Sequence, residues 1–361
     1  MPPHARACRT RRAVTHLFAT PRPFVYSVPS NLTDADSRME IPDLFFNGAG
    51  RLRAIWRLAA FAVVYLVAFT ALILFTNFGL AFALSPEAHD RLLVESDWAF
   101  VIQSFIYFLP AALAGWLCGY ALEDLPWRAL GWALHRGWAR DLLKGLLVGA
   151  VSLGLAAAIG AGAGGIGFGL PTRFDAAGEA RTLFASAFIF LLGAAAEEMS
   201  FRGYALQTAM RSWPFLLSLI PTSVFFALVH LGNPNVAPGF TFANTLLAGV
   251  LLAVAYRRTR SLWFPFGLHF GWNWVQGAVL GSPVSGITQI TPDPLLRFND
   301  TGPTWIGGGA YGLEGGAACT LALLSAILFV WRTRLVSATE EMRQYTDGEN
   351  PNPPVSTLVE S

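Results

Sequence analysis

Two carboxylates and a guanidinium directly follow an uncharged stretch of the chain. Residues 182–196 contain no Asp, Glu, Lys or Arg, and Glu197, Glu198 and Arg202 come next. On a helix Glu198 and Arg202 are i,i+4 neighbours that can form an ion pair, whereas Glu197 lies about 100° further round. If this stretch crosses a membrane, each carboxylate costs about 2.5–3.5 kcal/mol to insert. We therefore expect Glu197 to face a polar group elsewhere in the fold.

Two later apolar stretches contain such groups. Phe226 and His230 are separated by four positions, and so are His269 and Asn273, so each pair shares one helix face. Amide hydrolysis needs a general base for the attacking water and hydrogen-bond donors for the developing oxyanion. An acid, two imidazoles and an amide on three neighbouring apolar stretches match that chemistry.

Each of these residues also has a plainer explanation when it is taken singly. A lone histidine on an apolar helix is commonly a hydrogen-bonded core residue, and an asparagine in a membrane bundle commonly joins two helices. The pair formed by Glu198 and Arg202 near an interface could be a structural tie. The combination favours function, because ionisable residues inside a membrane are costly and here they are confined to a few consecutive stretches.

Other enzyme classes lack their motifs in this sequence. There is no His-Glu-x-x-His for a helical metal site, no P-loop and no dinucleotide fingerprint after a strand. The cysteines are far apart and form no Cys-x-x-Cys pair, which argues against a disulfide framework or a thiolate metal site. They are Cys8, Cys118 and Cys319. The net charge of +2 indicates no particular partner, and we expect no nucleic-acid binding.

The composition predicts a polytopic membrane protein. Hydrophobic residues make up 54% of the 361 residues and charged residues 13%, against roughly 25% in soluble domains. The apolar runs are long enough to cross a bilayer as helices and lack the strict alternation of a membrane β-barrel. We expect an all-α bundle of about eight transmembrane helices with a polar intramembrane cavity. The expected spans are 55–84, 98–122, 141–164, 181–211, 213–231, 240–256, 262–280 and 317–331.

Basic clusters predict the orientation of these spans. With eight spans, every basic cluster between them falls on one side of the membrane, including Arg257, Arg258 and Arg260. Lys and Arg are enriched in cytoplasmic loops. This pattern predicts a multi-pass protein of the inner membrane with both termini in the cytoplasm.

The three motifs in this order resemble those of the CAAX protease and bacteriocin-processing (CPBP) intramembrane endopeptidases, which are related to the type II CAAX prenyl endopeptidase. The motifs are Glu-Glu-x-x-x-Arg at 197–202, Phe-x-x-x-His at 226–230 and His-x-x-x-Asn at 269–273, and the resemblance covers about residues 140–280. It implies that Glu197 is the general base and that His230 helps to hold the water. It further implies an oxyanion hole made by His269 and Asn273, with Glu198, Arg202 and Phe226 in supporting roles.

The resemblance defines the core of the chain, and composition and hydropathy divide the rest. We expect a disordered N-terminal tail, or a tail that precedes a true start at Met39, and a disordered C-terminal tail. The expected parts are the tail 1–50, the N-terminal transmembrane helices 51–139, the catalytic helix core 140–280, the external loop 281–316, the last transmembrane helix 317–334 and the tail 335–361.

The predicted function is hydrolysis of a peptide bond in a membrane-associated protein or peptide, without a cofactor. The expected partners are that substrate and the lipid bilayer, and neither the identity of the substrate nor its prenylation follows from the residues. One alternative is a non-catalytic membrane protein, such as a bacteriocin-immunity or scaffold protein. Another is a zinc site made by Glu197, His230 and His269, since imidazole and carboxylate are suitable zinc ligands.

Overall fold

The computed structural model describes residues 41–48, 50–172, 175–236 and 239–347. The predicted disorder of residues 1–40 and 348–361, and the alternative start at Met39, lie outside these residues. The chain divides into two units, residues 1–51 and 52–361. The described part of the first unit contains the short helix α1 (Ile41–Phe45). All the remaining helices and strands belong to the second unit.

The described residues form an all-α fold, as the composition predicts. Five helical segments are long and apolar enough to cross a membrane, and α8 and α12 are shorter apolar helices. The total of eight spans and the position of a cavity within the bilayer stay predictions. The five segments are α2 (Ala54–Ala83), α4 (Asp97–Glu123), α5 (Trp138–Gly162), α6 with α7 (Ala176–Ser212) and α9 (Phe240–Thr259), and the shorter helices are α8 (Phe215–His230) and α12 (Ala317–Arg332).

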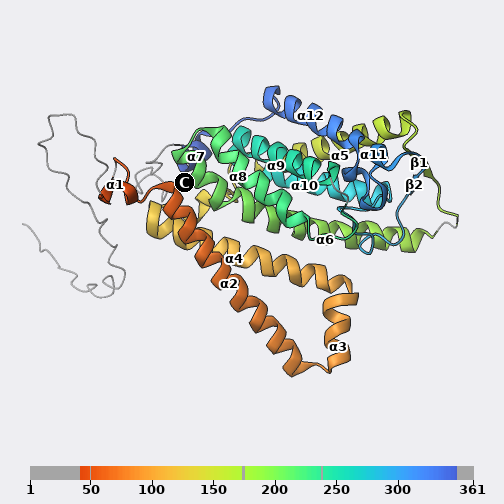
Figure 1. Ribbon diagram of the computed structural model, residues 1–361, viewed down its shortest axis with the longest axis horizontal. Helices are drawn as coiled ribbons and strands as arrows, with labels where there is room; N and C mark the ends of the chain where they lie inside the picture. The colour runs from red at the N-terminus through yellow and green to blue at the C-terminus, as the bar shows by residue number, and fades with distance from the viewer. Residues whose placement is uncertain (1–40, 49, 173–174, 237–238, 348–361) are drawn as a thin grey trace, which may run out of the picture. The chain divides into compact units, whose positions relative to one another are not determined.

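Helices α2 and α4 form the N-terminal arm of the second unit. They lie close together near α7 and diverge toward α3 (Pro86–Asp90), as Figure 1 shows. The π-helical turn Arg91–Glu95 leads from α3 into α4. Most side chains along α2 are exposed in the unit, which fits a helix whose solvent is lipid.

A buried ion cluster joins the ends of α2, α4 and α7. Glu123 at the end of α4 lies 2.7 Å from Arg57 Nη1 of α2 and 2.8 Å from Arg211 Nε of α7. Its other oxygen accepts a hydrogen bond from Thr208 Oγ1 at 2.8 Å. A buried charge without a partner is strongly destabilising, so this cluster holds the three helix ends together.

Close helix packing fixes α10 (Trp263–Trp274) against α5. A Cβ atom on Gly149 of α5 would lie 2.1 Å from the carbonyl oxygen of Leu268, and one on Gly267 of α10 would lie 2.2 Å from that of Leu142. The two backbones therefore touch, as in small-residue interfaces of membrane helices. The π-helical turn Val275–Val279 continues from the end of α10.

The segment that follows α10 folds onto the helices. Strand β2 (Arg297–Asp300) pairs antiparallel with β1 (Ile166–Gly169), with Ile166 opposite Asp300. Leu313 is fully buried in this segment. The predicted external loop is thus ordered over its length. The helical turns of this segment are α11 (Thr304–Gly307), Gly309–Tyr311 and Leu313–Gly315. A further helical turn, Trp127–Leu130, lies elsewhere in the chain, where it follows α4.

The described part of the C-terminal tail is ordered, which corrects the expectation of disorder for residues 335–347. Helix α13 (Glu340–Thr346) begins at Thr339, whose hydroxyl accepts a hydrogen bond from the Met342 amide at 3.3 Å. Met342 and Tyr345 are buried in one cluster with Leu125, Ala129 and Ala133. The two apolar side chains of this short helix cover an apolar loop, which a polar and acidic tail does not reveal.

Candidate active site

Helix α6 (Ala176–Arg202) carries the two adjacent glutamates near its end. Asp175 caps the start of this helix, because its carboxylate accepts a hydrogen bond from the Ala177 amide at 3.2 Å. Gly203 directly follows the last helical residue. Glu197 keeps 35% of its side-chain surface exposed, whereas the Glu198 side chain is fully buried. The two carboxylates therefore face different surroundings, as their 100° separation predicts.

Glu198 joins α6 to α10. Its Oε1 atom accepts hydrogen bonds from Arg202 Nη1 at 3.1 Å and from His269 Nδ1 at 3.0 Å. Arg202 also donates to the Gly249 carbonyl of α9 at 3.2 Å. The i,i+4 pair expected from the sequence thus forms. The bond to His269 was not predicted, and it turns Glu198 into a group that orients an imidazole.

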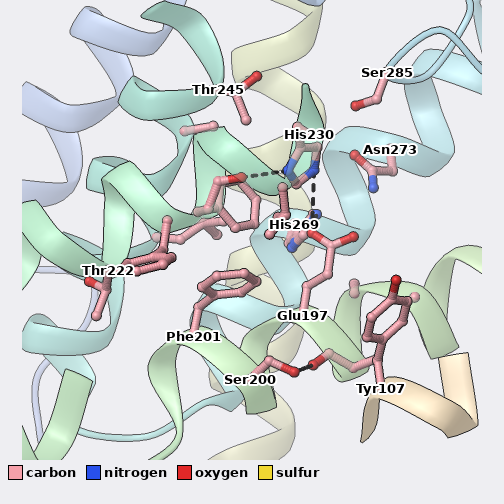
Figure 2. Close-up of a pocket in the computed structure, with 18 of the residues that line it drawn as sticks. Tyr107, Glu197, Ser200, Phe201, Thr222, His230, Thr245, His269, Asn273 and Ser285 are labelled. Carbon is pink, nitrogen blue, oxygen red and sulfur yellow. Dashed lines mark hydrogen bonds and ion pairs between the residues drawn. The ribbon is translucent and has the colours of Figure 1, made fainter. Parts of the chain in front are cut away.

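Glu197 lies between the two histidines. Its Oε2 atom is 3.7 Å from His230 Nε2 and 3.7 Å from His269 Nε2. The same oxygen is buried and has no hydrogen-bond partner among the described residues. Three polar atoms from α6, α8 and α10 therefore surround one small volume, and dashed lines in Figure 2 mark some of these contacts.

The hydrogen bonds at the other ring nitrogens indicate the tautomers. His230 Nδ1 lies 2.7 Å from the Phe226 carbonyl oxygen, which can only accept, so Nδ1 carries a proton. His269 Nδ1 faces the Glu198 carboxylate and donates in the same way. In the neutral form, both rings therefore direct an Nε2 lone pair toward Glu197.

Phe226 packs between the ion pair and the His230 ring. The Arg202 guanidinium lies 4.4 Å from the centre of the Phe226 ring, a cation–π contact, and the His230 ring centre lies 4.5 Å from it on α8. Phe201 packs edge-on against Phe226 with ring centres 5.2 Å apart. The phenylalanine therefore supports both the buried arginine and one of the imidazoles.

Asn273 completes the predicted set. It lies one turn after His269 on α10, is half-buried, and lines the same cavity as Glu197 and both histidines. Figure 2 shows its amide beside His230, directed toward the space in front of Glu197. The four predicted catalytic residues thus meet in one place.

The cavity has a volume of about 740 Å³, within the size range of small-molecule and peptide sites. Most of its wall is apolar and comes from α2, α4, α6, α8, α9 and α10. The polar groups of the motifs gather at one part of this wall (Figure 2). The polar cavity expected from the sequence is therefore polar over only a part of its wall.

Several residues of the wall lie outside the motifs. Tyr107 of α4 lies near Glu197 and Ser200 in Figure 2, and Ser285 and Glu314 come from the segment after α10. Nothing in the spacing of these residues indicates a site. A signal that could have been used is the isolated charge of Glu314 among the glycines of residues 307–316.

The geometry of the described side chains also bears on a metal centre. Within the ranges that the structure describes, no group of three or more His, Cys, Asp or Glu side chains is arranged to hold a metal ion. The zinc ligands considered from the sequence are Glu197, His230 and His269, whose Oε2 and Nε2 atoms are the three polar atoms that meet here.

The fold and the site define the class of this protein. Several apolar helices long enough to span a membrane surround a cavity whose wall includes a carboxylate, two imidazoles and an amide, which indicates a multi-pass membrane protein with a polar site in an apolar cavity. Residues 179–275, from α6 to the end of α10, match the family model described as type II CAAX prenyl endopeptidase Rce1-like. This match confirms the family resemblance drawn from the three motifs and implies a peptidase. No curated protein sequence and no solved structure matches the chain significantly.

Proposed function

We propose that this protein is an intramembrane endopeptidase that hydrolyses a peptide bond with a water activated by Glu197. The observation that carries the proposal is the position of Glu197 Oε2, 3.7 Å from the Nε2 atoms of both His230 and His269. The family match over residues 179–275 supports the same class of reaction.

The hydrogen-bonding capacity of these atoms favours a water at this point. With both Nδ1 atoms engaged, the neutral rings offer acceptors at Nε2, and the ionised Glu197 oxygen is also an acceptor. Three converging acceptors need a shared donor. A water molecule supplies two protons, so it can donate to Glu197 and to His230 at once, with its own lone pair free for attack.

The proposed reaction follows from this arrangement. The water oxygen attacks the carbonyl carbon of the substrate while Glu197 takes a proton, and the carbonyl oxygen becomes an oxyanion. The amide of Asn273 donates to that oxyanion. The single proton of the neutral His269 ring is engaged with Glu198 through Nδ1, so His269 keeps its Nε2 acceptor toward the water. Glu197 then gives its proton to the leaving nitrogen, and the C–N bond breaks.

Glu198 and Arg202 act as positioning residues in this scheme. Glu198 holds the His269 ring at 3.0 Å, and Arg202 neutralises the buried carboxylate while it bonds to α9. A displacement of a reacting group by about 1 Å can lower the reaction rate about 10²-fold. The support of His230 by Phe226 has the same purpose.

The proposed substrate is a peptide or a segment of a membrane protein. The largely apolar wall suits a segment that comes from the bilayer, and the cavity volume allows several side chains. The apolar wall also leaves open the non-catalytic alternative, in which the cavity binds a peptide without cutting it. These two functions differ in whether the Glu197 carboxylate is needed.

A comparison of membrane-protein fragments in cells tests the proposal. Cells producing the wild-type protein, the Glu197→Gln variant or the Glu87→Gln variant are compared by mass spectrometry of new peptide termini. Glu87 is an exposed residue of α3 and is not among the described residues of the cavity wall, so it is the matched control. We expect fragments with wild type and Glu87→Gln that disappear with Glu197→Gln. Identical fragments with all three, or a cellular phenotype that survives Glu197→Gln, would favour the non-catalytic role.

A further inference from the structure

The segment after α10 contributes a second carboxylate to the cavity. Glu314 lines the same cavity as Glu197, although it lies outside the residues matched by the family model. Its side chain accepts hydrogen bonds from the Ser285 amide at 2.7 Å, from the Ser285 hydroxyl at 2.8 Å and from Trp272 Nε1 at 3.2 Å. A carboxylate is an acceptor-only group, and three donors suit it.

The backbone at Glu314 is held as firmly as its side chain. Asn244 of α9 donates its amide to the Glu314 carbonyl at 2.8 Å and to the Gly316 carbonyl at 2.9 Å. Its oxygen accepts from Thr320 Oγ1 of α12 at 2.6 Å. Glu314 is therefore a fixed charge, anchored to α9, α10 and α12, and not a mobile loop side chain.

Glu314 lies on a definite side of the proposed catalytic group. Its partner Ser285 appears beyond Asn273 as seen from Glu197 in Figure 2. Trp272, which donates to Glu314, is the residue directly before Asn273. A peptide that contacts Glu197 and Asn273 can therefore extend within the same cavity toward Trp272 and Glu314.

The charges of the wall have one sign. Among the described residues that line the cavity, Glu197 and Glu314 carry carboxylates and none is Lys or Arg. Arg202 lies behind the wall and is matched by Glu198. Because charge interactions are stronger beside a largely apolar wall than in bulk water, a further negative charge brought in by a substrate meets two carboxylates and no Lys or Arg of the described wall.

We propose that Glu314 is a specificity-determining residue that selects peptides with a basic residue beside the scissile bond and rejects those with an acidic one. The proposal rests on the proposed peptidase function, and it names the substrate class of that site. Like charges brought together in a desolvated interface cost several kcal/mol.

A binding experiment tests this inference without requiring cleavage. The full-length protein with Glu197→Gln is titrated in detergent with labelled, N- and C-terminally capped Leu/Ala peptides that carry a single Lys, Gln or Glu. The Glu197→Gln background removes the other carboxylate of the described wall. We expect the Lys peptide to bind at least about tenfold more tightly than the Glu peptide, since unfavourable charge pairing alone is worth that much.

A second substitution assigns the preference to one residue. In the same background, Glu314→Gln should bring the affinities of the Lys and Glu peptides to within about threefold of each other. Glu87→Gln should leave the ratio of these affinities unchanged. Asn233→Lys adds a cation to the same wall without touching the hydrogen bonds of Glu314. It should lower the ratio even if the Glu314→Gln protein does not fold.

The outcomes separate this inference from the proposed function. The role of Glu314 is overturned if the ratio of Lys-peptide to Glu-peptide affinity is the same in the Glu197→Gln protein and in both further variants. This holds whether or not the wild type cleaves peptides. A preference that depends on Glu314, in a protein whose cleavage does not depend on Glu197, supports the binding preference and contradicts the proposed mechanism.

Discussion

Glu198 Oε1 and His269 Nδ1 are joined by a buried hydrogen bond of 3.0 Å. This bond fixes the ring so that its Nε2 atom lies 3.7 Å from Glu197 Oε2. The two adjacent glutamates are therefore linked through one imidazole. Glu198 supports the ring from behind, and Glu197 meets its free nitrogen in the cavity.

Removal of the Glu198 carboxylate should cost mainly stability. Glu198→Ala leaves the fully buried Arg202 without its ion-pair partner and His269 without its acceptor. Loss of one partner of a buried pair costs about 3–5 kcal/mol, and thermal unfolding in detergent measures it. Glu197→Gln, which breaks no described hydrogen bond of Oε2, should unfold within a few degrees of wild type. Equal losses for the two variants would contradict this division of roles.

The glycine contact between α5 and α10 should be intolerant of added atoms. Gly149→Ala brings a methyl group to 2.1 Å from the Leu268 carbonyl oxygen, so the two helices must separate. Such overpacking costs about 1–3 kcal/mol, and it should also lower peptidase activity, because α10 carries His269 and Asn273. The matched control is Gly154→Ala in the same helix, where an added Cβ meets no atom within 4 Å. A Gly149→Ala protein as stable and active as the control would show that the close approach is unimportant.

The ion cluster at Glu123 should be required for the attachment of the N-terminal arm. Glu123→Ala removes the shared partner of the buried Arg57 and Arg211, and we expect a loss of about 3–5 kcal/mol. Limited proteolysis should then cut preferentially within α2 to α4. The exposed Glu87→Gln substitution should leave both unfolding and proteolysis unchanged. Unaltered proteolysis of a folded Glu123→Ala protein would contradict the structural role of this cluster.

Metal analysis decides between activated water and zinc at Glu197. A metal-free mechanism predicts substoichiometric zinc in the purified protein and hydrolysis that survives a strong chelator. Stoichiometric zinc that is lost in both His230→Ala and His269→Ala proteins would instead assign these imidazoles as ligands. The readout is elemental analysis of protein that is purified without added metal and corrected for protein concentration.

Much of the site could be predicted because the residues that share a helix face are determined by their spacing in the sequence alone. The pairing of Glu198 with Arg202 and of Phe226 with His230 follows from a 3.6-residue period, and hydropathy locates the helices that carry them. The match of residues 179–275 to a family model confirms the resemblance inferred from those spacings over that part of the chain. The sequence also predicted that Glu197 and Glu198 face different surroundings, because adjacent residues on a helix point about 100° apart.

Contacts between distant segments could not be predicted in the same way. The bond from Glu198 to His269 depends on how α6 and α10 pack, and α10 is itself placed against α5 by glycine contacts that were not predicted from the sequence. Glu314 reaches the cavity because its segment folds back onto α9, which no periodicity encodes. Helix α13 was missed because only two of its side chains provide its packing.

The turnover of one peptide by the wild-type and Glu197→Gln proteins tests the central claim most directly. A peptide spanning a cleavage site found in cells is incubated with both proteins in the same detergent, and kcat and KM are measured separately. The account predicts that Glu197→Gln lowers kcat about 10³-fold, within the range of general-base catalysis, while KM changes by less than about threefold because the side chain keeps its size. A folded Glu197→Gln protein with a kcat within threefold of wild type would contradict it.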